Sequence, residues 1–165
     1  MSPVALKFDL VPEVRCSSHR AIGFLHGDPE LNAHDTFTAL NEPERRYLLS
    51  SMGEWIDGQN RPATRFHGFP NHPDCSMCFV FKAREKRQGH RFYAYLCHPL
   101  RNSNPRFQLC VLCIHALKNQ WETDQAELAR VKAWYADDAA KVAIRAQYPD
   151  EGKNEQKGRQ KQWKN

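Results

Sequence analysis

The sequence lacks any apolar run that approaches the roughly 20 residues needed to span a bilayer. Its start, Met1-Ser-Pro-Val, also lacks the charged and apolar segments of a secretory signal. We therefore expect a cytoplasmic protein without a membrane partner. In that compartment the six cysteines are expected to be thiols or metal ligands rather than disulfides. No internal repeat is evident.

Positive charge is unevenly distributed along the 165 residues. The net charge is +5, yet residues 82–91 alone carry +4 and residues 151–165 carry +3, which leaves −2 for the rest of the chain. Such concentration favours a polyanionic partner. The alternative interpretation is a solvated hairpin turn followed by a solubilising tail.

The N-terminal third contains one predicted strand and one predicted helix. Apolar residues alternate with polar ones over residues 3–10, a pattern typical of a half-buried strand. Asn41 is a predicted helix N-cap, with Glu44 three residues later as in a capping box. An apolar stripe at helical spacing follows and ends at Asp57-Gly58. Residues 11–35 give no clear prediction.

The remainder predicts an antiparallel meander followed by a helix. Three strands are expected at residues 77–84, 90–97 and 107–116, with a further short strand near 64–69. A final helix is expected from Thr123 to about Tyr148, where Pro149 stops it. The predicted fold is a single α+β domain over residues 1–149, with a small antiparallel sheet packed on helices. Residues 150–165 are predicted to form a basic, disordered tail.

Two C-x-x-C pairs are present, Cys75 with Cys78 and Cys110 with Cys113. Four such ligands suit a tetrahedral zinc site, so Zn²⁺ is the alternative cofactor. The second pair, however, lies inside an apolar stretch that reads as a strand. In a strand, residues three apart project to opposite faces, so Cys110 and Cys113 are poorly placed to share one ion. We therefore favour buried thiols and no cofactor.

The predicted strands also align cations with aromatic rings. Lys82 and Arg84 lie on one face of their strand, and Arg91, Tyr93 and Tyr95 share one face of the next. Such a surface can hold phosphates through its cations and stack bases on its rings. The alternative is that the tyrosines are half-buried in the sheet and the cations solvate an edge. The candidate RNA-binding residues are Arg84, Lys86, Arg87, His90, Tyr93 and Tyr95.

These segments resemble the RelE/ParE toxin superfamily, and within it the phage-associated HigB-like branch. The resemblance rests on the basic strand 79–84, the strand 89–95, the apolar strand ending at Lys118 and the helix start at 122–131. It spans about residues 36–136.

The resemblance implies a metal-independent endoribonuclease that cuts mRNA, usually on the ribosome, and is neutralised by a cognate antitoxin. Carried over position by position, Lys82, Arg91 and Lys118 match the basic residues of the family site. RNA cleavage by its own 2′-hydroxyl also needs groups that move protons. Three side chains are candidates for that role: His90, His115 and Tyr93.

Two other functions remain open at this point. The first is a zinc-binding nucleic-acid-binding protein or phage accessory protein without catalysis. The second is a member of the same superfamily that acts on a protein target, such as gyrase.

Overall fold

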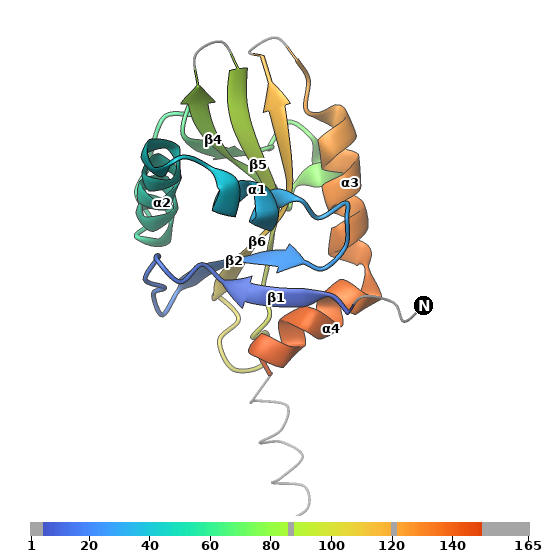
Figure 1. Ribbon diagram of the computed structural model, residues 1–165. Coiled ribbons are helices and arrows are strands. Elements are labelled where there is room, and N and C mark those ends of the chain that lie inside the picture. The colour runs from blue at the N-terminus through green and yellow to red at the C-terminus, as the bar shows by residue number, and fades with distance from the viewer. Residues whose placement is uncertain (1–4, 86–87, 120–121, 150–165) are drawn as a thin grey trace, which may run out of the picture.

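One six-stranded mixed sheet forms the middle layer of this α+β fold, seen in a computed structural model (Figure 1). The structure describes residues 5–85, 88–119 and 122–149, and of residues 84, 85 and 88 the backbone only. The expected tail at 150–165 lies outside these residues, as do Lys86 and Arg87. Within the described ranges there are six strands and four α-helices.

The sheet has the strand order β1-β2-β6-β5-β4-β3. Strands β2 and β6 pair in parallel, and every other neighbouring pair is antiparallel. The predicted meander is therefore confirmed. The strands are β1 (Lys7–Leu10), β2 (Arg20–His26), β3 (Phe66–Gly68), β4 (Cys78–Glu85), β5 (Gln88–Cys97) and β6 (Gln108–Lys118).

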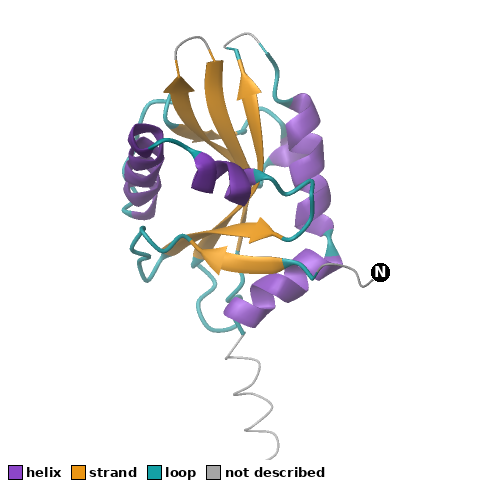
Figure 2. Ribbon diagram, viewed as in Figure 1, coloured by secondary structure: helices purple, strands orange, loops and turns teal. Residues whose placement is uncertain are grey.

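Helices cover both faces of the sheet (Figure 2). The face covered by α3 and α4 is called the α3 face below, and the face covered by α1 and α2 is called the α2 face. Because both faces are covered, the central strands are buried on both sides. The helices are α1 (Ala33–Ala39), α2 (Glu42–Ile56), α3 (Gln125–Ala136) and α4 (Asp138–Gln147), with a short 3₁₀ turn at Pro73–Cys75.

Helix α2 begins and ends close to where the sequence predicts. The side chain of Asn41 accepts a hydrogen bond from the backbone N–H of Glu44 at 3.0 Å, which confirms the predicted N-cap. Leu48, Met52 and Trp55 bury the predicted apolar stripe against the α2 face of the sheet. The stripe therefore serves the core.

The single C-terminal helix expected from Thr123 to Tyr148 is instead two helices. Asp137 has an extended backbone, with ψ at 130°, and its side chain accepts from the N–H of Ala140 at 2.9 Å. An aspartate that caps a new helix in this way ends the preceding one. The change of direction lets α4 pack beside β1 (Figure 1).

A β-bulge in strand β6 decides which residues reach each face beyond it. The register between β5 and β6 shifts between Tyr93 and Ala94, and Cys113 has no partner in the ladder. Beyond the bulge, the extra residue reverses the alternation of β6 side chains between the two faces of the sheet. As a result His115 pairs with Phe92 on the α2 face, whereas Lys118 lies on the α3 face.

Among the residues that the structure describes, no helix combines the length and the apolar character that crossing a bilayer requires.

Candidate functional site

The strand register brings the three basic residues singled out by the resemblance onto one face. Lys82 pairs directly with Arg91 across β4 and β5, and Gly89 pairs with Lys118 across β5 and β6. Residues in these directly opposed and diagonal positions are side-chain neighbours. Lys82, Arg91 and Lys118 thus form a cation cluster on the α3 face, at the end of the sheet shown at the top of Figure 1.

Arg91 donates hydrogen bonds to the segment that leads into α3. Its Nη1 donates to Asp124 Oδ1 at 2.7 Å and to the backbone oxygen of Glu122 at 3.3 Å. Its Nη2 donates to the backbone oxygen of Asn119 at 3.3 Å. The residue is only 8% exposed. Arg91 therefore ties the connection between β6 and α3 to the sheet.

Asp124 is the carboxylate at the centre of this network. It accepts from Arg91 and also from the hydroxyl of Tyr93, whose ring is fully buried. Burial, together with the hydrogen bond to Asp124, raises the pKa of Tyr93 far above its ordinary value. Tyr93 consequently stays protonated and acts as a hydrogen-bond donor.

Lys118 is paired with a second acidic residue of α3. Its Nζ lies 2.5 Å from Glu127 Oε1, and Glu127 is 8% exposed. The other carboxylate oxygen, Oε2, is buried without a hydrogen-bond partner among the described residues. A buried carboxylate with one unsatisfied oxygen is uncommon and calls for a physical explanation.

Lys82 is the cation of the cluster that forms no ion pair with another described residue. Burial and the neighbouring charge of Arg91 lower the pKa of Lys82, and Asp124 opposes this in part. An ammonium group in this position gains from the approach of an anion, because the anion offsets both effects.

His67 completes the cluster and was not a candidate from the sequence. It pairs with Val80 across β3 and β4, so it is a diagonal neighbour of Lys82 on the same face. Its Nδ1 lies 2.7 Å from the backbone oxygen of Gly68, which places the proton on Nδ1 and the lone pair on Nε2. Burial lowers the pKa of His67, and the charge of Lys82 acts in the same direction. The ring is therefore neutral near pH 7.

His90 and His115 lie on the opposite side of the sheet from this cluster. His90 is 7% exposed, with Nε2 at 3.4 Å from Glu44 Oε2 and Nδ1 at 2.8 Å from His115 Nε2. Burial and the neighbouring His90 lower the pKa of His115 to about 4. Asn32 holds the backbone of His115 through two hydrogen bonds, of 2.8 and 3.1 Å. The structure therefore separates His90 and His115 from Lys82.

The structure corrects the expectation that Tyr93 and Tyr95 stack on bases. Their exposures are 0% and 2%, because α3 and α4 cover the face on which they lie. Alternation along a strand predicts that the two rings share a face, but it does not reveal a helix packed over them. The side chain of Arg84 lies outside the described residues, like Lys86 and Arg87.

The cysteines are divided between the two faces as the strand pattern predicts. Cys110 belongs to the core of the α2 face, whereas Cys78 and Cys113 belong to that of the α3 face. Burial, with the neighbouring Cys75 acting in the same direction, raises the pKa of the Cys78 thiol to about 12. Within the described part of the chain no three His, Cys, Asp or Glu side chains are arranged to hold a metal ion.

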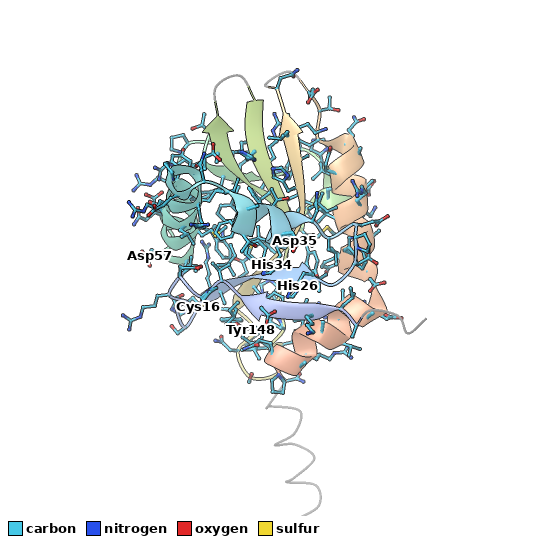
Figure 3. The ribbon with its side chains drawn as sticks, viewed as in Figure 1. Cys16, His26, His34, Asp35, Asp57 and Tyr148 are labelled. Atoms are coloured by element: carbon cyan, nitrogen blue, oxygen red, sulfur yellow. The ribbon has the colours of Figure 1, made fainter. Side chains whose placement is uncertain are left out.

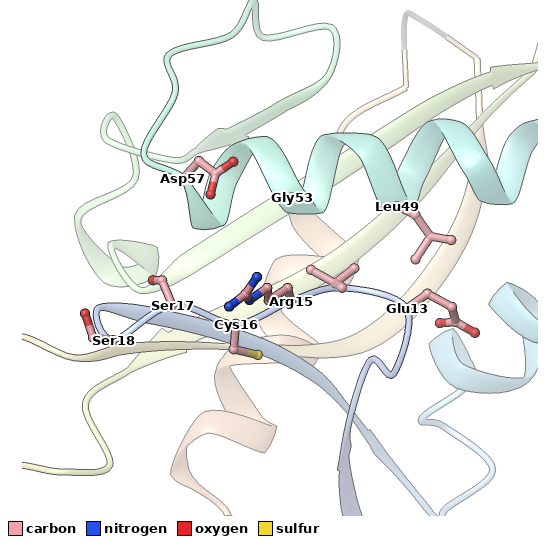
Figure 4. Close-up of a pocket in the computed structure, with 9 residues that line it drawn as sticks. Glu13, Arg15, Cys16, Ser17, Ser18, Leu49, Gly53 and Asp57 are labelled. Atoms are coloured by element: carbon pink, nitrogen blue, oxygen red, sulfur yellow. The ribbon is translucent and has the colours of Figure 1, made fainter.

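Two further features lie on the α2 side of the molecule. Stacked imidazole rings of His26 and His34, with centroids 4.4 Å apart, lie beside Asp35 (Figure 3). An open hollow of about 630 Å³ separates α2 from the loop between β1 and β2, with Arg15 and Asp57 among its lining (Figure 4). Neither feature contains a residue of the cation cluster.

Comparisons of the chain with protein-family models, with curated proteins and with solved structures find no match.

Proposed function

We propose that this chain is a RelE/HigB-like endoribonuclease that binds mRNA at the cation cluster and cleaves it without a metal ion. The observation that supports the proposal most is the strand register that gathers Lys82, Arg91 and Lys118 on one face. Three cations at adjoining sheet positions suit a phosphodiester backbone. In this proposal the substrate is mRNA on the ribosome, in the cytoplasm, and a cognate antitoxin neutralises the protein.

The residues of the cluster match the proton movements that the reaction requires. The ribose 2′-oxygen attacks phosphorus. The new bond between the 2′-oxygen and phosphorus gives a 2′,3′-cyclic phosphate, as the bond between phosphorus and the leaving 5′-oxygen breaks. His67, neutral near pH 7, takes the 2′-hydroxyl proton on Nε2. Lys82, whose pKa is lowered, stabilises charge on the phosphate and gives a proton to the leaving 5′-oxygen.

Arg91 and Lys118 have a different part in this scheme. Both are already paired with carboxylates of the α3 segment, so their charges are partly neutralised. Arg91 in addition holds the loop before α3. We therefore assign the proton transfers to Lys82 and His67, and contact with RNA phosphates, without proton transfer, to Arg91 and Lys118.

The test compares Lys82→Met with a matched control, Lys141→Met, at an exposed lysine of α4. Both variants remove one charge and keep an unbranched side chain. Cleavage of a labelled single-stranded RNA should fall at least tenfold in Lys82→Met and in His67→Gln, and remain unchanged in Lys141→Met. Loss of one phosphate contact should also make RNA binding less steeply salt-dependent.

Two outcomes separate the proposal from its alternatives. RNA binding that depends on Lys82, without any cleavage, would support the non-catalytic nucleic-acid-binding protein. Equal behaviour of Lys82→Met and Lys141→Met in both assays would remove the cluster as the site. Circular dichroism of each variant establishes that the fold is retained.

A further inference from the structure

The first residues of α3 place two carboxylates against the cation cluster. Asp124 holds Arg91 and Glu127 holds Lys118, although these two cations come from different strands. The two acids lie three positions apart around the start of one helix, so both face the sheet. One helical turn therefore neutralises two of the three cations that the proposed function needs.

Asp124 does not serve the helix on which it lies. It occupies the N-cap position of α3 yet makes no capping hydrogen bond with its side chain. An N-cap aspartate ordinarily accepts from the free N–H groups of the first turn. In this chain the carboxylate turns towards Arg91 and Tyr93 instead, leaving the start of the helix without that cap.

Glu127 shows the same departure from an ordinary helix start. A glutamate in the first turn is stabilised by the helix dipole and is normally solvated. Glu127 is instead 8% exposed, and its Oε2 has no hydrogen-bond partner among the described residues. The buried position thus leaves half of the carboxylate unsatisfied, while Oε1 neutralises Lys118.

We infer that Asp124 and Glu127 form a built-in competitor, which occupies the cations that would otherwise hold RNA phosphates. The inference rests on the proposed function. Carboxylate and phosphate oxygens bind the same guanidinium and ammonium groups, so they exclude each other at Arg91 and Lys118. RNA must displace the first turn of α3, and the described arrangement is a low-affinity state.

The experiment measures single-stranded RNA binding at one fixed salt concentration for wild type, Glu127→Gln and a matched control. The control is Glu13→Gln, an exposed acid that lines the hollow beside α2 (Figure 4). Both substitutions remove one negative charge and keep the size of the side chain. We expect binding to strengthen about tenfold in Glu127→Gln and at most about twofold in the control, since screening weakens distant charges.

Asp124→Asn provides a second test of the inferred competition between these carboxylates and RNA. It removes the charge opposite Arg91 and keeps an oxygen that accepts from Tyr93, and it should also strengthen binding about tenfold. The competitor would be refuted by a result in which neither Glu127→Gln nor Asp124→Asn binds RNA more tightly than the Glu13→Gln control.

Repeating the RNA-binding measurements with Lys82→Met added to each variant separates failure of the competitor from failure of the proposed function. RNA binding that depends on Lys82, with no gain in the acid variants, refutes the competitor alone. RNA binding that does not depend on Lys82 in any variant refutes the proposed function, and the inference falls with it.

Discussion

Replacing Arg91 by methionine should destabilise the protein strongly, whereas the same replacement of Lys82 should not. The two residues face each other across β4 and β5, so the pair is a matched comparison at adjoining positions. Arg91 makes three hydrogen bonds or ion contacts to the segment before α3, while Lys82 forms no ion pair with the described residues. Methionine retains most of the apolar stem of either side chain.

The size of the difference follows from what each replacement leaves behind. Arg91→Met leaves Asp124 with Tyr93 as its remaining donor, and Asp124 is 24% exposed at its side chain. Breaking a fully buried pair costs about 3–5 kcal/mol. Because Asp124 is partly solvated, we expect a loss of about 2–3 kcal/mol. Lys82→Met removes a charge that burial disfavours, so we expect a change within about 0.5 kcal/mol or a slight gain.

Urea unfolding followed by tryptophan fluorescence measures both values under one condition. For a chain of this size, a loss of 2–3 kcal/mol corresponds to a fall in Tm of about 4–12 °C. Equal loss of stability in the two variants would contradict the assignment of Arg91 as the residue that anchors α3.

Three further outcomes are expected. His115 has a pKa of about 4 in the fold and an ordinary value of 6.5, so the unfolded chain takes up its proton first as the pH falls. Stability should therefore decrease from pH 6.5 to pH 4, and less so in His115→Gln, as thermal melts across this range will show. Gly53→Ala should raise Tm by removing a glycine from a helix interior where a Cβ meets nothing within 4 Å, whereas Gly23→Ala should lower it because its Cβ would lie 2.5 Å from a backbone oxygen. Cys110→Ser should cost about 1–3 kcal/mol because it buries a hydroxyl in an apolar core, and Cys75→Ser should cost little; one zinc per chain, found by metal analysis and lost in Cys110→Ser, would contradict the cysteine argument.

The sequence predicts those elements of the fold whose signals are local. The cap at Asn41 and the alternation in β4 and β5 depend on residues only two or three positions apart. Strand β2 (Arg20–His26) escapes prediction because it is buried on both faces and so shows no alternation. The break at Asp137 is likewise hidden, since one residue both ends α3 and caps α4.

The candidate site shows a similar limit. That Lys82 and Arg91 share a face follows from strand parity and the hairpin between them. Whether the side chains on this face are exposed to solvent depends on α3, which begins more than 30 residues after Arg91. No local sequence pattern indicates that this helix covers them. His67 joins the cluster through the pairing of β3 with β4, which alternation alone does not specify.

The parallel pairing of β2 with β6 has a consequence for the order in which the chain folds during synthesis. Arg20 pairs with Gln108, so β2 has no neighbour on that side until about 90 further residues have been made. At roughly 5–20 residues per second, translation takes about 5–20 s to supply that neighbour. During this interval the apolar strand β2 can pair with β1 at one edge, while its other edge on the nascent chain has no partner strand. Chaperone dependence should therefore concentrate in the N-terminal segment.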